Sequence, residues 1–254
     1  MSSDRFNAFT PEERKHFSRL SVIVVSPIAD YEVSNLFCKS LANMMAYSWM
    51  QGLKTYVYGY TERTVVDWAR NSLGRYVRDT KCEYTGDFYT HVLWIDSDHA
   101  FNPDLACQLA RHDKDAVSAL YFARGEKPLP IAYVKPEKPK SVDLEDKDAY
   151  KHSQILEVPP VLMEIDAVGF GALLMKRDLF VKIPEPWFTI DWKAGEDVAF
   201  CVKAKEYGYQ FFLDGRYILG HIDAPRVVSK DDYLRYRQDH PDEFENLLRV
   251  SVGG

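Results

Sequence analysis

The sequence of 254 residues lacks features that mark several large classes of protein. No apolar run approaches the roughly 20 residues that a membrane-spanning helix needs. The N-terminal stretch MSSDRFNAFTPEERKHF is polar and charged, unlike a signal peptide. The four cysteines are scattered and form no C-x-x-C pair, a pattern typical of reduced cytosolic thiols. We therefore expect a cytoplasmic protein without a transmembrane segment.

The chain also lacks an excess of positive charge. Its formal net charge is −6, which argues against a general nucleic-acid binder, although a local basic patch is compatible with this total. No internal repeat is present. After the first apolar stretch, where a nucleotidyltransferase usually has a glycine-rich basic loop for a triphosphate, the sequence reads SPIADYE. This disfavours a nucleotidyltransferase.

What is present is an alternation of strand-like and helix-like segments, in a chain long enough to bury a large core. The β-branched run at 20–26 predicts a strand covered on both faces, and a helix is predicted over 35–51. A second strand is predicted over 54–60, a helix over 64–78 and a buried strand over 92–95. This order predicts an α/β fold, in which a mostly parallel central sheet is flanked by helices in a single domain.

The second half of the chain is less regular. A strand is predicted at 210–213, and a final strand or turn at 216–219. The charged, proline-rich stretch 135–153 is expected to be an exposed loop, either a lid over the site or an insertion. The domain is expected to span 1–228. Residues 229–254 are expected to form an amphipathic helical tail, broken near Pro241, that covers the core or pairs with another subunit.

Two aspartates follow the buried strand at 92–95. Asp96 and Asp98 are two positions apart, so at a strand end both side chains point to one side. Two carboxylates held together repel unless a cation lies between them, and oxygen ligands suit Mn²⁺ or Mg²⁺. The alternative is an acidic turn before the next helix.

Two further groups of residues could contact a ligand. Asp67, Arg70 and Asn71 share one face of the predicted helix and could read a base and ribose, or form a solvated helix surface. Gly169 and Gly171 would let the backbone approach a ligand closely, or would mark a bend or bulge in a strand.

The remaining candidates lie late in the chain. Glu196 and Asp197 open a predicted helix over 197–207, where they could cap free N–H groups or, in one case, point into a cleft as a general base. His221 follows a predicted short strand and a glycine, which would let it approach the aspartate pair; a lone histidine can also be purely structural.

In this order and spacing, these motifs resemble the GT-A class of glycosyltransferases, especially family-2-like enzymes and related short bacterial and phage proteins. The resemblance runs from about residue 20 to residue 221. It is carried by the first buried strand, by DWARN at 67–71, by DSD at 96–98, by GFG at 169–171, by GEDVAF at 195–200 and by GH at 220–221.

The resemblance implies a function and a set of site residues. A divalent metal, Mn²⁺ or Mg²⁺, would hold the diphosphate of a nucleotide sugar, with a UDP-sugar as the expected donor, against Asp96, Asp98 and His221. As in inverting members, Asp197 would be the base, with Glu196 as its alternative, and transfer would invert the anomeric centre; a retaining arrangement stays open. The donor site that the resemblance implies comprises Pro27, Asp67, Arg70, Asn71, Asp96, Ser97, Gly169 and Gly171.

Several alternatives stay open at this point. The acceptor is a glycan or a hydroxymethylated base in phage DNA. The competing functions are a nucleotidyltransferase and a non-catalytic module that binds a nucleotide or a carbohydrate. Oligomerisation through the C-terminal tail is also compatible with the sequence.

Overall fold

The computed structural model describes residues 9–28, 32–60, 64–135, 152–190, 194–223 and 226–244. Most of the loop expected at 135–153 and the last ten residues of the tail lie outside this part of the chain. Within the described residues, the helices are α1 (Pro11–Phe17), α2 (Asn35–Met50), α3 (Val66–Asp79), α4 (Leu105–Ala110), α5 (Asp178–Lys182), α6 (Glu196–Glu206) and α7 (Lys230–Asp239), with a 3-10 turn at Pro241–Glu243. The strands are β1 (Ser21–Pro27), β2 (Lys54–Tyr60), β3 (His91–Ile95), β4 (His99–Ala100), β5 (Ala116–Leu120), β6 (Ala132–Val134), β7 (Ser153–Gln154), β8 (Leu162–Ile165), β9 (Ala167–Val168), β10 (Ala172–Lys176), β11 (Phe211–Ile218), β12 (Gly220–Asp223) and β13 (Arg226–Val228).

A seven-stranded sheet in the order β2-β1-β3-β10-β5-β11-β8 forms the centre of the molecule. Strand β1 is parallel to β2 and β3, and β5 is parallel to β11. Strand β10 is antiparallel to both β3 and β5, and β8 is antiparallel to β11. Five strands therefore point one way and two the other, which confirms the predicted α/β class with a mostly parallel sheet.

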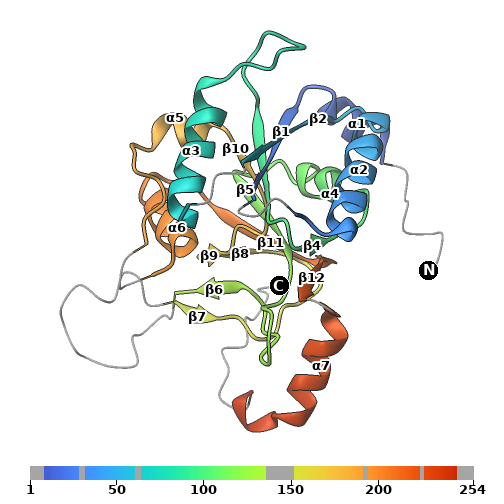
Figure 1. The fold of residues 1–254 in the computed structure, drawn as a ribbon, viewed down its shortest axis with the longest axis vertical. Coiled ribbons are helices and arrows are strands. Elements are labelled where there is room, and N and C mark those ends of the chain that lie inside the picture. Colours follow the sequence, from blue (N-terminus) through green and yellow to red (C-terminus); the bar gives the residue numbers. More distant parts are fainter. Residues whose placement is uncertain are drawn as a thin grey trace.

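Helices cover both faces of this sheet. Figure 1 shows α3, α5 and α6 on one side and α1, α2 and α4 on the other. Along β1, Ile23 and Val25 pack in the core beneath α3, whereas Val22 and Val24 pack in the core beneath α2. Because successive side chains of a strand point to opposite faces, a strand covered on both sides must be apolar throughout, and this explains the continuous run at 20–26.

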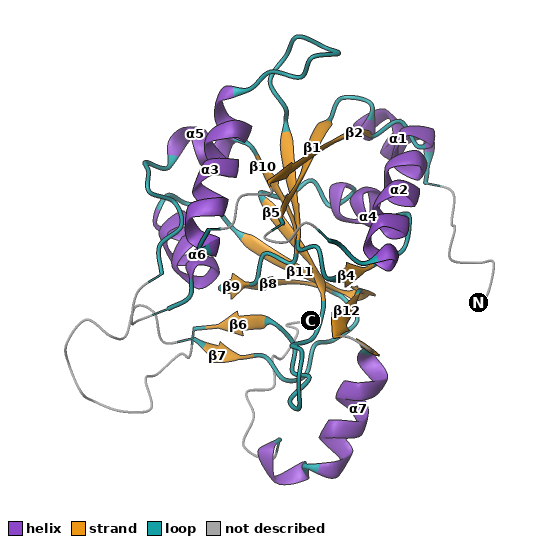
Figure 2. Cartoon of the chain, viewed as in Figure 1, coloured by secondary structure: helices purple, strands orange, loops and turns teal. Residues whose placement is uncertain are grey.

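The parallel strands end together at one edge of the sheet, which we call the carboxyl edge. Pro27 ends β1, Ile95 ends β3, Leu120 ends β5 and Ile218 ends β11. Two small sheets, β13-β12-β4 and β7-β6-β9, continue from these strands, and α7 lies beyond them (Figure 2). Ligands of open α/β sheets bind at this edge, and the residues after β3 and β11 are brought together here.

One predicted boundary was wrong. The strands predicted at 210–213 and 216–219 form a single strand, β11, with an irregular register between Asp214 and Ile218. Asp214 and Gly215 resemble a turn in sequence, but the Asp214 carboxylate accepts hydrogen bonds from Arg216 within the strand. A bulge-like irregularity of one strand therefore lies where two separate elements were expected.

Within the described part of the predicted tail, α7 is helical and a 3-10 turn begins at Pro241. Helix α7 packs onto the carboxyl edge through Tyr233, whose ring stacks on Phe122 with centroids 5.2 Å apart. Pairing of this tail with another subunit, and the domain limits 1–228, stay predictions. Among the residues that the structure describes, none belongs to a helix both long and apolar enough to cross a membrane.

Candidate functional site

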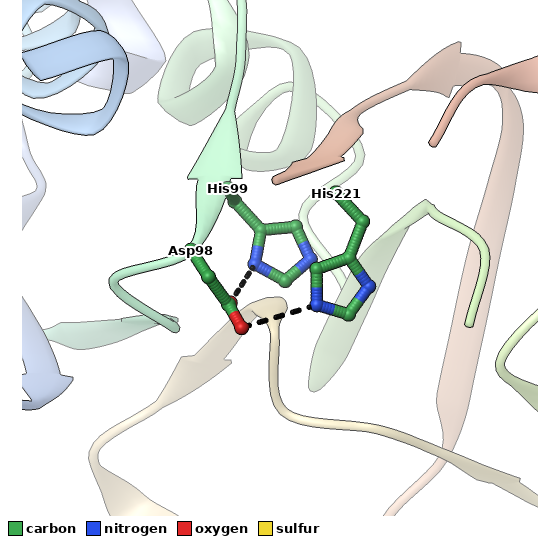
Figure 3. Close-up of side chains that lie close together, drawn as sticks. All are labelled: Asp98, His99 and His221. Atoms are coloured by element: carbon green, nitrogen blue, oxygen red, sulfur yellow. Dashed lines mark ion pairs between the residues drawn. The ribbon is translucent and has the colours of Figure 1, made fainter. Parts of the chain in front are cut away.

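Two histidines and an aspartate meet at the carboxyl edge. Asp98 follows β3, and His99 begins the short strand β4. Strand β4 pairs with β12 in antiparallel register, so that His99 lies opposite His221. The two imidazole rings stack with centroids 4.4 Å apart and an interplanar angle of 18°. Figure 3 shows both rings beside the Asp98 carboxylate; we call these three residues the metal cluster.

Both imidazoles turn a ring nitrogen toward Asp98. The distance from His221 Nε2 to Asp98 Oδ2 is 3.2 Å, and that from His99 Nδ1 to Asp98 Oδ1 is also 3.2 Å. The other nitrogen of His221, Nδ1, lies 2.8 Å from the carbonyl oxygen of Phe122. A carbonyl only accepts, so Nδ1 carries a proton; Nε2 donates to the carboxylate when the ring is protonated and presents a lone pair to it when the ring is neutral. Two acceptors at this distance repel each other unless a proton or a metal ion lies between them.

The buried ring of His99 strengthens the case for a metal. Its side chain is fully buried; Nδ1 has only the contact with Asp98, and Nε2 has no hydrogen-bond partner. Burial acts to raise the pKa of Asp98, but its interactions with His221 and His99 outweigh burial and hold that pKa well below the usual range. Ligand atoms of the three residues all lie within 4.8 Å of one another. One carboxylate and two imidazoles suit a divalent transition metal such as Mn²⁺, and a backbone carbonyl that orients a ligating histidine is a common support.

The sequence therefore predicted two of the three residues in this cluster. Asp98 and His221 come together as expected, whereas His99 was assigned no role. Its position directly after DSD was a signal, but its meaning depends on β4, a two-residue strand that no sequence pattern marks.

Asp96 lies beside a cation instead of joining this cluster. Its Oδ1 lies 3.3 Å from Arg70 Nη2, and Arg70 Nε donates to Glu196 Oε1 at 3.1 Å. The Arg70 side chain is only 5% exposed and lies against the rings of Trp94 and Phe170. The predicted role of Asp96 as a metal ligand would need this carboxylate to serve the metal and Arg70 together.

Burial raises the pKa of both carboxyl groups at the start of α6. Arg70 opposes this shift at Glu196 and Asp197, while the neighbouring carboxylates add to it. Asp197 Oδ1 also accepts the Val198 N–H at 2.7 Å, so it bonds one free N–H of the first turn, although the N-cap residue of α6 is Gly195. A buried carboxylate with a raised pKa is the type of group that serves as a general base. Capping and catalysis are compatible here because the second oxygen of Asp197 does not take part in that hydrogen bond.

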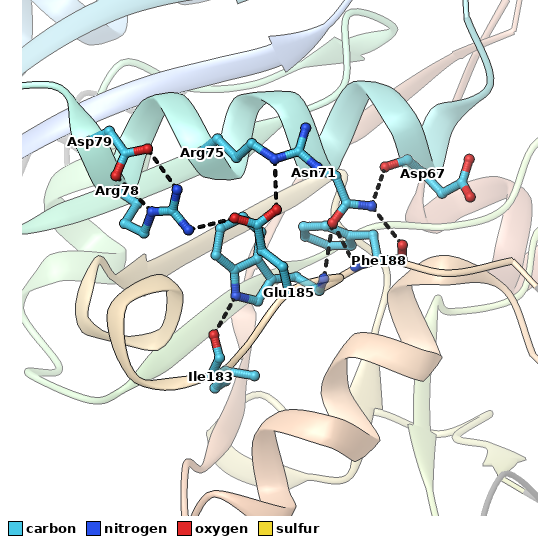
Figure 4. Close-up of polar contacts among 9 residues, drawn as sticks. Asp67, Asn71, Arg75, Arg78, Asp79, Ile183, Glu185 and Phe188 are labelled. Carbon is cyan, nitrogen blue, oxygen red and sulfur yellow. Dashed lines mark hydrogen bonds and ion pairs between the residues drawn. The ribbon is translucent and has the colours of Figure 1, made fainter.

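Asn71 has a structural partner for every polar atom of its amide. Its Nδ2 donates to the carbonyls of Asp67 and Phe188, at 2.8 Å and 2.6 Å. Its Oδ1 accepts from the N–H groups of Trp187 and Phe188, at 3.0 Å and 3.2 Å. Figure 4 shows this side chain between α3 and the loop before α6. The structure argues against the predicted nucleotide contact from Asn71, because no hydrogen-bonding group is left over.

Asp67 and Arg70, the other two helix residues predicted at the donor site, differ in their surroundings. Asp67 is partly exposed in the first turn of α3, and its Oδ1 accepts the Trp68 N–H at 2.9 Å. Its role at a nucleotide stays a prediction. Arg70 points inward to the carboxylates, so a direct contact with the donor would be made next to Asp96.

The two glycines make room for side chains of the protein itself. A Cβ on Gly171 would lie 2.7 Å from His99 Cε1 and 2.8 Å from Tyr121 Cζ, and a Cβ on Gly169 would collide with the Tyr121 hydroxyl. Tyr121 Oη accepts the Gly171 N–H at 3.0 Å. The glycines therefore allow the backbone to approach His99 and Tyr121 closely; their predicted contact with a phosphate is untested.

Pro27 and Ser97, the last two donor-site predictions, both lie at the carboxyl edge. Pro27 pairs with Tyr60 at the end of β1, and partly exposed Ser97 lies between the two aspartates. Their contacts with a donor stay predictions.

A cavity of about 560 Å³ lies under α7, away from these carboxylates. Phe122, Tyr233, Pro159 and Gly215 are among its lining residues. Phe122 also provides the carbonyl that holds His221. The cavity thus adjoins the metal cluster through one residue but contains none of the predicted catalytic groups.

Comparison of the sequence with protein-family models and with curated proteins found no match. Solved structures do match. The chain aligns with A197 from STIV at a TM-score of 0.53 and 16% identity, over 84% of this chain and 91% of that one. It also aligns with GalNAc-T7, solved with UDP, GalNAc and Mn²⁺, at a TM-score of 0.43 and 12% identity, over 86% of this chain and 48% of that one. The first likeness shows a shared fold alone, and the second is too low to carry an argument.

Proposed function

We propose that this chain is a metal-dependent glycosyltransferase that moves a sugar from a nucleotide sugar, with UDP-sugars as the first choice, to a hydroxyl acceptor. The observation that carries the proposal is the metal cluster, in which the Phe122 carbonyl sets the tautomer of His221 and His99 has no other partner. The order of motifs that resembles GT-A enzymes supports the same function.

Asp98, His99 and His221 would hold the divalent ion. When bound, such an ion acts as a Lewis acid that neutralises the charge growing on the leaving diphosphate, a contribution of roughly several kcal/mol. Asp96 would contribute to the binding site of the nucleotide-sugar donor while it remains paired with Arg70. The buried setting strengthens these electrostatic interactions relative to water.

Asp197 would accept the proton of the acceptor hydroxyl. As the bond from the anomeric carbon to the diphosphate oxygen breaks, the acceptor oxygen forms the new bond and its proton passes to the carboxylate. A positioned base of this kind contributes about 10²–10⁴-fold. Glu196 is the less suitable base, because Arg70 already occupies its Oε1. With base and leaving group on opposite faces of the sugar, the anomeric centre inverts.

The test is a mass-spectrometric screen with UDP-, GDP- and CMP-sugars, in which metal-dependent donor hydrolysis is followed with and without EDTA. We expect hydrolysis of one donor class with Mn²⁺ and its loss with EDTA or in His99→Ala. Turnover that EDTA leaves unchanged would contradict the metal role. Binding of UDP and Mn²⁺ without turnover would favour the non-catalytic binding module.

The acceptor is proposed at the level of a hydroxyl group on a glycan or on a hydroxymethylated DNA base. Each of these two acceptors can be tested with the donor that the screen identifies. Transfer to only one of them would select between them.

A further inference from the structure

Arg124 is the one charged residue of the described chain, outside the metal cluster, within ion-pair distance of Asp98. Its Nη1 lies 3.0 Å from Asp98 Oδ2, the same oxygen that lies 3.2 Å from His221 Nε2. The backbone on either side of Arg124 is anchored: the Ala123 N–H donates to the Leu129 carbonyl, and the Gly125 N–H donates to Asp223 Oδ2. The Arg124 side chain itself is 53% exposed. The backbone at Arg124 is thus held in place, while the exposed guanidinium can change its partner.

This arrangement conflicts with a metal ion on Asp98. A divalent ion between Asp98 Oδ2 and His221 Nε2 would bind the same carboxylate oxygen whose negative charge the guanidinium now neutralises. Two cations on one carboxylate oxygen repel each other strongly at such distances. The half-exposed arginine is the partner that gives way, because it can move into solvent whereas His221 is held by the Phe122 carbonyl.

A displaced guanidinium would still lie within reach of a diphosphate bound to the metal ion. The planar fork of arginine matches two oxygens of a phosphate, which makes it a strong binder of such groups. We propose that Arg124 is the counter-ion of Asp98 in the metal-free protein, that a divalent ion displaces it, and that the released guanidinium then binds the diphosphate of the donor. The phosphate contact rests on the proposed function, whereas the exchange of counter-ions does not.

The proposal predicts opposite effects of one substitution on two ligands. In Arg124→Gln, the affinity for Mn²⁺ alone, measured by isothermal titration calorimetry, should rise about two- to fivefold, as expected when a half-exposed ion pair no longer competes. The affinity of the Mn²⁺-loaded protein for UDP should fall about 10- to 100-fold, as expected for a lost charge-assisted hydrogen bond. A purely structural role would move both affinities in the same direction or neither.

Two further variants sharpen this test. Arg124→Lys keeps the charge, so its Mn²⁺ affinity should stay near that of the native protein and its UDP affinity should fall by less than in Arg124→Gln. Lys127→Gln is the matched control, because Lys127 is an exposed cation on the same loop that pairs with Glu243 rather than with Asp98. Neither affinity should change in this control.

Inorganic pyrophosphate separates this proposal from the proposed function. Weaker pyrophosphate binding by Mn²⁺-loaded Arg124→Gln supports the proposal even if no sugar is ever transferred. An unchanged or lower Mn²⁺ affinity in Arg124→Gln overturns the exchange of counter-ions. Unchanged binding of both UDP and pyrophosphate overturns the phosphate contact.

Discussion

Asn71 and His99 are both buried polar residues near the carboxyl edge, and their surroundings are opposite. Asn71 has four hydrogen bonds to the protein, whereas neither ring nitrogen of His99 has one. Buried polar groups are costly when left without partners. A fully bonded side chain therefore marks structure, whereas a buried ring whose only polar contact is one carboxylate marks a position suited to a ligand.

The largest effect should come from the metal cluster. Asp98→Asn keeps the size of the side chain but removes the charge that a divalent ion needs, so sugar transfer should fall about 10³-fold, the equivalent of several kcal/mol. The circular-dichroism spectrum should remain that of the folded protein, but the melting temperature should fall at neutral pH, because the ionised carboxylate interacts favourably with its neighbours in the fold. Mn²⁺-dependent turnover within a few-fold of the native rate would remove Asp98 from the site.

The base should show nearly as large an effect on rate, with the opposite consequence for stability. Asp197→Asn should lower transfer about 10²–10⁴-fold while UDP binding is retained. Burial raises the pKa of Asp197 in the folded protein, so its contribution to stability is present at low pH and lost as pH rises through that pKa. At neutral pH the Asn variant should be at least as stable in urea as the native protein.

The same pKa should set the pH dependence of the proposed transfer reaction. A general base must be ionised, so transfer should decline as the pH falls through a pKa above the ordinary aspartate range. A rate that stays constant down to pH 4, or unaltered turnover in Asp197→Asn, would remove this residue as the base.

Substitution of Asn71 should change the stability of the protein and not its affinity for a metal ion. Asn71→Ala leaves buried backbone groups of residues 187 and 188 without partners, so the free energy of unfolding should fall by about 3 kcal/mol. Urea unfolding measures this loss, and calorimetry should find Mn²⁺ affinity unchanged in the folded variant. A large drop in UDP affinity with no loss of stability would restore the predicted nucleotide contact.

The smallest effect should come from Gly171→Ala. The added methyl group would push on the His99 and Tyr121 rings, so we expect Mn²⁺ affinity to fall about 10- to 100-fold, as it does when groups that orient metal ligands are disturbed. Gly208→Ala is the contrasting substitution, because its Cβ meets open space but its φ of +85° strains the backbone. It should lower stability without a change in Mn²⁺ affinity.

Most of the fold could be predicted from local patterns. The bounds of β2 were predicted to the residue, and those of α2 within one residue, because β-branched runs, apolar periodicity and a final glycine are local signals. The bulge in β11 was missed because Asp214 and Gly215 resemble a turn until the partners of the carboxylate are known.

The site was predicted less completely, for a different reason. Asp98 and His221 carry chemistry that their residue types reveal, and the ends of parallel strands share one edge. His99, Arg124 and the structural role of Asn71 could not be predicted, since each depends on a partner more than 20 residues away in the chain. Residue type alone does not distinguish a residue that binds a metal ion from one that stabilises the fold.

The sequence by itself determined the α/β class, the order of the main strands and helices, and the presence of carboxylates after β3 and at the start of α6. These follow from periodicity and from residues that are adjacent in the chain. Only the tertiary structure decided that His99 joins His221, that Arg70 pairs with Asp96, and that Asn71 supports a loop. The physical reason is that hydrogen bonds and ion pairs depend on distances of about 3 Å, which pairing between remote strands sets and local sequence does not.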